Sequence, residues 1–280
     1  MIGSLQTGVS GLQQFQEDLE VIGNNIANVN TNGYKSASMD FQDALSQSLE
    51  NGVNGSSGMQ VGTGVATAAI MSNFTQGTVN TTGVTTNLAI SGDGFFMVKD
   101  PSSGLTYATR DGEFNLDSSG YVISAGGQRV QGVMGASTAI TDLQINSATA
   151  VAALNDTTTP APTLQSYTIN SSGQITATLN DGTSGVIGQV MLQNFSDPQS
   201  LMKQGNNLFS YTAAAGPLAA PGAPNTTGLG KIVSGSLESS NVDLAGQMAS
   251  LITAQRAFEA NAKMITTSDE VLQTLVNLKR

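Results

Sequence analysis

A short acidic run and a glycine-flanked aspartate are the clearest candidates for chemistry in this sequence. Asp111, Glu113 and Asp117 lie close together, as the oxygen ligands of a cation would. Their spacing does not follow the EF-hand calcium loop, and no acidic residue stands where that loop needs its bidentate glutamate. Gly92-Asp93-Gly94 lacks the third glycine of a dinucleotide-binding loop, and the run FFMV after it is typical of a strand. Both patterns therefore indicate turns, and we expect no metal site and no cofactor.

Nucleophilic catalysis has little to work with in this chain. The sequence contains no Cys and no His, which removes thiolate ligands, disulfides and the commonest general base. Catalysis would need paired carboxylates or a Ser–Lys arrangement, and none of the few lysines lies in a recognisable nucleophile motif. We therefore predict no catalytic residues and no enzymatic activity. A carboxylate-based hydrolase remains an alternative, and it would require a cleft that holds an acid of raised pKa.

The net charge of the chain indicates which classes of partner it can bind. The 280 residues include 20 acidic and 10 basic side chains, a formal net charge of −10. This argues against nucleic acid and anionic membranes as partners, because both require clustered Lys and Arg. Charged residues make up only 11% of the chain, against about 25% in typical soluble domains. A surface of hydroxyls and amides suits packing against copies of the same chain, and it also suits a secreted β-rich protein.

Two sequence features bear on location. No uninterrupted apolar stretch approaches the ~18 residues of a transmembrane helix, so we expect no membrane insertion. The start MIGSLQTGVSGLQQ lacks a basic region followed by a continuous apolar region, as a secretory signal would have. We therefore expect a protein that stays in the cytoplasm or leaves by a route without a cleaved signal peptide.

The two ends of the chain carry the strongest helical periodicity. Within residues 1–30 the apolar residues recur every three or four positions. Residues 240–280 show a near-heptad apolar register that Gln255 and Asp269 interrupt. At ~1.5 Å per residue, each end would form a helix of roughly 40–50 Å. We predict that these helices pair with each other, or with the ends of neighbouring copies, as a coiled coil.

The region between the helices indicates β structure. Alternating apolar residues and turn dipeptides predict a β domain from residues 76–135 and 183–239. Residues 31–75 indicate an extended Gly-rich connector, and residues 136–182, rich in Ala and Thr, indicate a small insertion. The predicted fold class is α+β, with paired terminal helices, a central all-β domain and the connector.

An asparagine-rich run ends the first helix. VIGNNIANVNTNGYK places Asn24, Asn25, Asn28, Asn30 and Asn32 ahead of a glycine, although asparagine is a mediocre helix former. Backbone groups lose their helical partners where a helix ends, and side-chain amides can bond them without adding charge. We interpret the run as satisfying those groups and contacting neighbouring subunits, with Gly33 supplying the turn.

Long motifs in this chain resemble the bacterial flagellar rod and hook proteins. The likeness lies in LEVIGNNIANVNTNGYK, NLAISGDGFFMV, YATRDGEFNLDSSGYVISAGGQRVQG, NFSDPQSLMKQGNNLF and the stretch from SGSLESSNVDL to the end. It spans nearly the whole chain except about residues 136–180. The resemblance implies a structural subunit that is exported by the flagellar export apparatus without a cleaved signal. It also implies polymerisation into the hollow axial tube that transmits torque.

Within that family the sequence favours the hook over the distal rod. The ending VLQTLVNLKR and the loop before GLGKIVSGSLESSNVDL resemble hook protein, whereas the connector SQSLENGVNGSSGMQVGTGV resembles the distal rod. The implied partners are further copies of the chain, neighbouring rod and hook proteins, and hook–filament junction proteins. From another class, a secreted β-rich adhesin would explain the low charge but not the paired terminal helices.

The predicted assembly interface combines the apolar stripes of both terminal helices with the asparagine run. Its residues are Leu12, Leu19, Ile22, Asn24, Asn25, Ile26, Asn28, Asn32, Gly33, Leu244, Met248, Leu251, Phe258, Ile265 and Leu272.

Overall fold

The chain forms two compact units. The computed structural model describes residues 2–50, 59–135, 137, 139–154, 162–211, 215–216, 220–226 and 228–278. One unit, here the helical unit, comprises Met1–Val29, Lys35–Asn73 and Val242–Arg280. The other, here the β unit, comprises Asn30–Tyr34 and Phe74–Asn241. The prediction of helices at both ends around a central β domain is confirmed.

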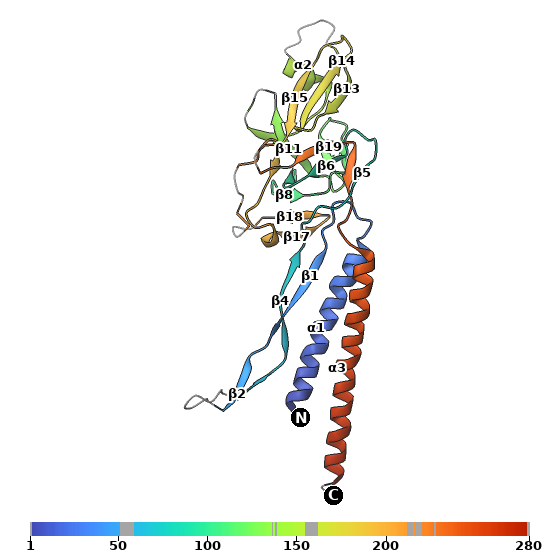
Figure 1. Ribbon diagram of the computed structural model, residues 1–280. Coiled ribbons are helices and arrows are strands. Elements are labelled where there is room, and N and C mark those ends of the chain that lie inside the picture. Colours follow the sequence, from blue (N-terminus) through green and yellow to red (C-terminus); the bar gives the residue numbers. More distant parts are fainter. Residues whose placement is uncertain are drawn as a thin grey trace. The chain divides into compact units, whose positions relative to one another are not determined.

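Two long helices dominate the helical unit. α1 spans Ile2–Ala27 and α3 spans Leu244–Leu278, and they lie side by side in opposite directions (Figure 1). α3 begins after Asp243, whose carboxylate accepts a hydrogen bond from the Ala245 N–H at 3.1 Å and so caps the free amides of the first turn. Of the helices that the structure describes, none is long and apolar enough to cross a membrane.

Strand pairs occupy the region predicted as an extended connector. β1 (Ala37–Asp43) pairs antiparallel with β4 (Val65–Ser72), and β2 (Ser46–Glu50) pairs with β3 (Met59–Gly62). β4, VATAAIMS, includes the β-branched residues Val65, Thr67 and Ile70, which suit a pleated surface. The β1–β4 pair packs along α1: the Phe15 and Phe41 rings lie 5.6 Å apart, and the Thr67 hydroxyl donates to Glu17 at 2.7 Å. The glycine-rich tip, residues 51–58, lies outside the described residues.

The β unit is built on one large antiparallel sheet whose strands differ in length. Its main path runs β13-β14-β15-β11-β7-β8-β18-β17, with β9, β10, β12 and β16 attached to it, and β6–β19 and β5–β20 form separate pairs. The strands are β5 (Val79–Thr81), β6 (Leu88–Ser91), β7 (Phe95–Lys99), β8 (Thr106–Thr109), β9 (Phe114–Leu116), β10 (Val122–Ser124), β11 (Arg129–Met134), β12 (Ile140–Asp142), β13 (Leu164–Ile169), β14 (Gln174–Leu179), β15 (Ser184–Val190), β16 (Leu192–Gln193), β17 (Met202–Gly205), β18 (Leu208–Ser210), β19 (Lys231–Ser234) and β20 (Ser236–Glu238). A 3₁₀ turn, η1, spans Pro198–Ser200.

The sheet continues through the segment predicted as a small insertion. β13 and β14 lie within residues 136–182, and β15 joins them to β11 by antiparallel pairing. A helix, α2 (Ser147–Leu154), packs on β15; the sequence analysis did not anticipate it, although its Ala-rich sequence suits a helix. Asn146 caps α2 by accepting from the Thr149 N–H at 2.7 Å. The Pro- and Thr-rich centre of the predicted insertion, residues 155–161, lies outside the described residues.

The core of the β unit is closed by aromatic side chains. Phe96 and Phe114 are fully buried and meet edge to face with centroids 5.2 Å apart. A second cluster holds Phe95, Phe195 and Phe209, with Phe74 packed against it. The β unit therefore has a hydrophobic core of its own.

A buried ion pair joins β20 to the end of β8 within the β unit. Arg110 Nη1 lies 3.5 Å from Glu238 Oε2, and their side chains are 4% and 0% exposed. Burial lowers the pKa of Arg110, against the raising effect of the nearby Glu238 and Asp93 charges. Glu238 Oε1 also accepts from the Gly77 N–H at 2.9 Å, so the pair connects three separate segments of this unit.

Candidate assembly surface

The face of α3 that is least exposed follows a regular spacing. Steps of four and three residues along the helix connect eight of its half-buried and buried positions: Gln247, Leu251, Ala254, Phe258, Asn261, Ile265, Ser268 and Leu272. Residues at this spacing lie along one side of the helix, and we call this set the seam. Apolar side chains at Leu251, Phe258, Ile265 and Leu272 alternate along it with small or polar side chains.

The seam of α3 meets two glycines of α1. A Cβ added at Gly8 would lie 3.1 Å from Ile265 Cγ1, and one at Gly11 would lie 3.0 Å from Asn261 Nδ2. The helices thus approach closely because these positions lack side chains. These two positions were not predicted from the sequence, in which two glycines three residues apart on α1 were the available signal.

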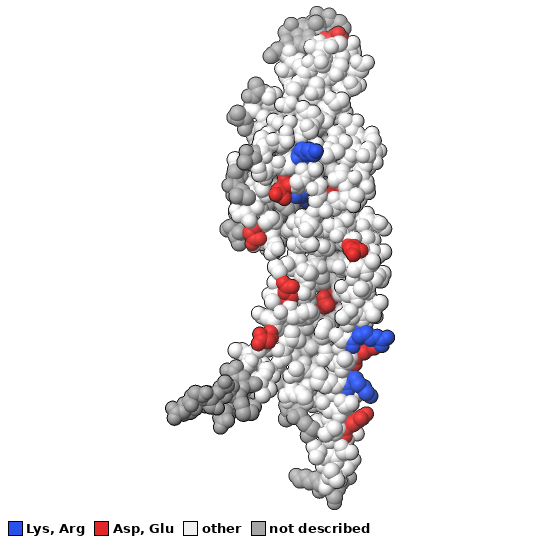
Figure 2. Space-filling view, in the orientation of Figure 1, with Lys and Arg blue, Asp and Glu red and all other residues white. Residues whose placement is uncertain are grey.

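α3 also exposes large apolar side chains at positions spread around the helix. Ile252, Val276 and Leu278 are 58%, 65% and 81% exposed. We call this set the outer stripe; its members are Leu244, Met248, Ile252, Met264, Val271, Leu275, Val276 and Leu278. α3 has 35 residues against 26 in α1, so it offers more helical surface than α1 can cover. Charged side chains on the face shown in Figure 2 are sparse.

The residues predicted for the interface divide between these surfaces. Ile22 is buried at 5% exposure, whereas Leu244 and Met248 are each 44% exposed and belong to the outer stripe. The remaining apolar members are half-buried: Leu12, Leu19, Ile26, Leu251, Phe258, Ile265 and Leu272. The predicted stripe therefore maps partly to the seam and partly to the outer stripe.

Asn25 is the most constrained residue of the asparagine run. Its side chain is 1% exposed and forms two hydrogen bonds with the backbone of Ala37: Nδ2 donates to the carbonyl at 2.7 Å and Oδ1 accepts from the N–H at 2.9 Å. Nδ2 also donates to Gln247 Oε1 at 3.0 Å. One amide thus fastens the start of β1 and the start of α3 to the end of α1.

Asn24 and Asn28 finish the helix. Asn28 Nδ2 donates to the Asn24 carbonyl at 2.9 Å and to Asn24 Oδ1 at 2.8 Å. The Asn24 carbonyl also accepts from the Asn28 N–H at 3.2 Å, so the Asn28 side chain reinforces the last turn of the helix. Asn24 itself is exposed and is open to solvent on one side.

Asn32 and Gly33 belong to the β unit. Asn32 Nδ2 donates to Glu113 Oε2 at 3.4 Å, and the Asn32 carbonyl accepts from Asn207 Nδ2 at 2.8 Å. Gly33 has a positive φ of 67°, and a Cβ there would lie 2.6 Å from the Asp111 nitrogen. Only glycine satisfies both conditions, so the turn predicted at Gly33 is present.

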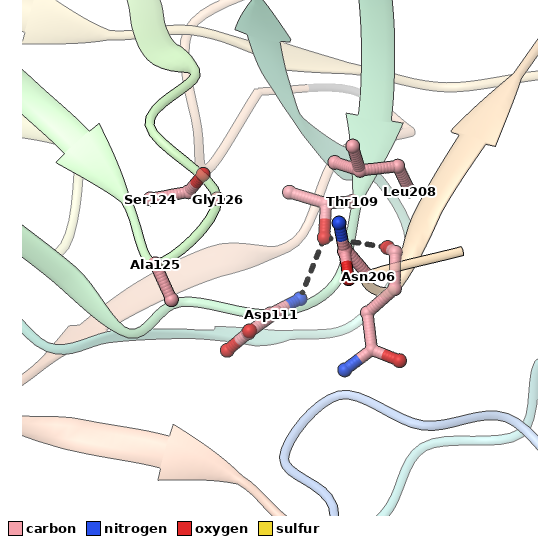
Figure 3. Close-up of a pocket in the computed structure, with 8 residues that line it drawn as sticks. Thr109, Asp111, Ser124, Ala125, Gly126, Asn206 and Leu208 are labelled. Carbon is pink, nitrogen blue, oxygen red and sulfur yellow. Dashed lines mark hydrogen bonds between the residues drawn. The ribbon is translucent and has the colours of Figure 1, made fainter. Parts of the chain in front are cut away.

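A polar pocket lies near this turn and is a candidate site for chemistry. It encloses about 290 Å³ and is lined by Thr109, Asp111, Ser124, Ala125, Gly126, Asn206, Asn207 and Leu208 (Figure 3). Burial raises the pKa of Asp111; the Glu113 charge adds to this, and a hydrogen bond from the Glu113 N–H opposes it. Asp111 is the single charged residue in this lining, so no acid–base pair is assembled there.

The acidic run considered for a cation does not gather into a site. Within the described part of the chain, no three His, Cys, Asp or Glu residues lie close enough together to hold a metal ion. Asp111 accepts from the Glu113 N–H at 3.1 Å, and Asp117 accepts from the Ser118 N–H at 2.6 Å. These are the bonds of carboxylates that stabilise turns.

Three family models match the chain in sequence order. Residues 5–35 match a model described as flagella basal body rod protein, and residues 89–177 match the flagellar hook protein FlgE/F/G D1 domain. Residues 233–278 match the C-terminal segment of the flagellar basal body rod FlgEFG proteins. The first and third models fall on the segments that contain most of α1 and α3.

Curated relatives match along their entire length. The flagellar basal-body rod protein FlgG of Bacillus subtilis is 38% identical over 100% of both chains, and that of Borreliella burgdorferi is 33% identical over 100% of both. The flagellar hook protein FlgE of Salmonella typhimurium is 26% identical, with 99% of this chain and 100% of that protein covered. A solved structure of Helicobacter pylori flagellar hook protein FlgE2 is 12% identical, covers 66% of this chain and 47% of that chain, and has a TM-score of 0.24, too low to support an argument about the fold.

Proposed function

The chain belongs to the FlgE/F/G family of flagellar rod and hook proteins, and we propose that it is a subunit of the basal-body rod. The family consists of axial structural components of the flagellum and is not a family of enzymes. The observation that carries the rod assignment is length. The two FlgG relatives align over 287 and 289 positions, close to the 280 residues here, with full coverage on both sides.

These relatives favour the distal rod, the alternative of the sequence analysis, over its first preference, the hook. The alignment with the hook protein runs over 415 positions, so that protein carries long segments without a counterpart in this chain. The C-terminal motif that favoured the hook falls in a model shared by the FlgE, FlgF and FlgG proteins, so it does not distinguish them. The connector, which favoured the rod, was the more informative feature.

Polymerisation in this proposal proceeds through the terminal helices. A tube requires a heterologous interface, one in which two different surfaces of the chain meet and repeat along a helix without closing into a ring. The outer stripe offers one such surface, since its apolar side chains have no cover in the described part of the chain. We propose that the outer stripe of one copy packs against the paired helices of the next and so builds a coiled-coil layer.

The asparagine run has a different role in this proposal from the one first expected. Asn25, Asn28 and Asn32 use their side-chain amides within the chain itself, so they set the path from α1 to the rest of the chain. We infer that they act on assembly indirectly, because they fix the path of the chain after the end of α1. Asn24 is exposed and remains a candidate for direct contact with a neighbouring copy.

The partners we propose follow from the same assignment. They are further copies of this chain and the neighbouring axial components of rod and hook, with delivery through the flagellar export apparatus and no cleaved signal. We propose no catalytic activity, no cofactor and no nucleic-acid partner. The supporting features are the acidic charge balance and the absence of His and Cys from the sequence.

Electron microscopy tests this function in two steps. Concentrated purified protein should form tubes, and antibody labelling of isolated hook–basal bodies should mark the basal body and not the hook. Label on the hook would contradict the rod assignment and leave the axial role intact. Protein that remains monomeric at high concentration and marks neither structure would contradict the proposed function altogether.

A further inference from the structure

The large sheet of the β unit ends in two edge strands of different character. β13 forms one end of its path and β17 the other. Among the described residues, β13 pairs only with β14 and β17 only with β18. An edge strand offers free backbone donors and acceptors to any extended chain that approaches, so natural proteins usually protect such edges.

β17 has the usual protections. It has four residues, and its pairing with β18 shifts register between Lys203 and Gly205, which marks a bulge. Lys203 places a charged side chain on this edge, with Nζ 5.0 Å from the centre of the Tyr34 ring. A short, bulged strand with a lysine is a poor template for a further strand.

β13 has little protection beyond a bulge near its start. Its six residues, LQSYTI, include no charge, no proline and no glycine. The register shift lies between Leu164 and Ser166, and the four residues Ser166–Ile169 pair regularly with β14. The Asn170 N–H donates to the Gln174 carbonyl at 3.0 Å, so by antiparallel alternation the backbone groups of Tyr167 and Ile169 point away from β14.

The surroundings of β13 also carry little charge; Asp181, in the turn between β14 and β15, is an exception. The sequence has no Lys or Arg between Arg129 and Lys203. On the face shown in Figure 2, the region of β13 to β15 is almost free of coloured side chains. Gln165, Ser166 and Thr168 are exposed, and no like charges on this strand would repel a second copy. Among the described residues, the edge thus combines backbone groups that point away from the sheet with a surface of little charge.

We propose that β13 pairs with an extended segment of a second copy of this chain in the assembled polymer. The inference rests on the proposed polymer, which supplies a neighbour at high local concentration. Copies that all point the same way along a tube cannot be related by a two-fold axis, so the partner segment differs from β13 and the contact is heterologous. Backbone hydrogen bonds to Tyr167 and Ile169 provide the affinity, as in other cases of strand addition.

Hydrogen exchange read by mass spectrometry tests the pairing without altering the protein. The peptide that contains residues 164–170 should exchange about tenfold more slowly in tubes than in the monomer, because the outward amides gain partners only on assembly. Peptides of β7 and β8, at the centre of the sheet, should not change and serve as the internal control. Slow exchange of 164–170 already in the monomer would mean that the chain covers its own edge, and it would overturn the inference.

A pair of variants isolates the backbone contribution. Ile169→Pro removes an outward N–H and costs no bond to β14, whereas Ile169→Ala removes most of the same side chain and keeps the N–H. We expect Ile169→Ala to form tubes and Ile169→Pro to lose them, with both monomers folded by circular dichroism. Equal assembly by the two variants would overturn the inference. If Ile169→Pro does not fold, the exchange measurement on the unaltered protein decides alone.

The two proposals fail in distinguishable ways. Tubes in which residues 164–170 exchange as fast as in the monomer contradict edge pairing and leave the rod function standing. Absence of tubes contradicts the function and removes the basis of this inference as well.

Discussion

The two units treat their apolar side chains in opposite ways. In the β unit Phe96 and Phe114 are completely buried, whereas in the helical unit Val276 and Leu278 are 65% and 81% exposed. Burial of a large apolar side chain contributes about 1.5–3 kcal/mol, so the β unit uses this free energy within one chain. The side chains of the outer stripe would gain this free energy only when neighbouring copies cover them. The contrast indicates that the β unit is stabilised within one chain, whereas the helical unit exposes apolar surface that neighbouring copies can bury. A polymer subunit needs both.

The largest expected effect separates assembly from folding on α3. Val276→Asp places a charge in the outer stripe and should abolish tubes and motility, because each subunit repeats the loss. The monomer should melt as before, since Val276 is exposed. Gln255→Asp adds the same charge at an exposed polar position of the helix and is the matched control. Normal tubes from Val276→Asp would mean that the outer stripe is not an interface.

The seam between the helices provides the next contrast. Phe258→Ala should weaken the packing of α1 on α3. The loss of stabilising free energy should be below the ~3–5 kcal/mol of a fully buried phenylalanine, because Phe258 is only half-buried. Tubes should be lost while the thermal transition of the β unit stays in place. A β unit that melts together with the helices would show that the chain has one cooperative core, and the comparison between units would fail.

A core change in the β unit should produce the reverse pattern. Phe96→Ala removes a fully buried ring and its edge-to-face partner contact with Phe114, and it should lower the free energy of unfolding of that unit by about 3–5 kcal/mol. Near-ultraviolet circular dichroism during thermal unfolding reports on this unit. The exposed Leu105→Ala, at 58% exposure, is the control and should change the midpoint little.

The buried ion pair sharpens the same distinction within the β unit. Arg110→Met removes one charge of this buried pair while the desolvated carboxylate of Glu238 stays, and it should cost about 3–5 kcal/mol. The double variant Arg110→Met with Glu238→Leu should recover most of that loss, because both desolvated charges are gone. Urea titrations of the two variants measure the difference. Equal destabilisation by both would mean that the segments depend on packing and not on charge.

The smallest expected effect is a pH dependence in the helical unit. Burial raises the pKa of Asp18 on α1, so folding opposes its ionisation. The contribution of Asp18 to stability should therefore be fully present below its unfolded pKa, near 3.8 for an ordinary aspartate, and should be lost as the pH rises through the folded pKa. Asp18→Asn should remove that dependence and leave the rest of the melting curve unchanged. A melting midpoint that does not respond to Asp18→Asn would exclude this role.

The sequence predicted the helices well and their faces only in part. Leu251, Phe258, Ile265 and Leu272 fall on the seam as the periodicity indicated, but Leu244 and Met248 do not. A helix of 3.6 residues per turn drifts against a seven-residue register, so an apolar pattern read over several turns wanders from one face to the next. The polar seam positions, such as Asn261, could not be recognised because their apolar partners lie on another segment.

The β unit exceeded what local patterns could predict. The turn at Gly33 was evident because a glycine after a run of asparagines is a strong local signal. The continuation of the sheet into β13 and β14 depends on pairing with β15 and β11, which are distant in sequence from one another and carry no mark of register. The strand pairs of residues 37–72 were likewise hidden by the glycines of the segment that links them.

The most direct test of the division between the two units is hydrogen exchange along the whole chain, in dilute monomer and in tubes. We expect peptides of α3 to exchange at least about a hundredfold more slowly in tubes, while peptides of the β-unit core around Phe96 exchange equally slowly in both states. That result would show that the helical unit gains its stability from neighbours. If α3 in a proven monomer is as protected as the β-unit core, the helices belong to an ordinary intramolecular core and the account is contradicted.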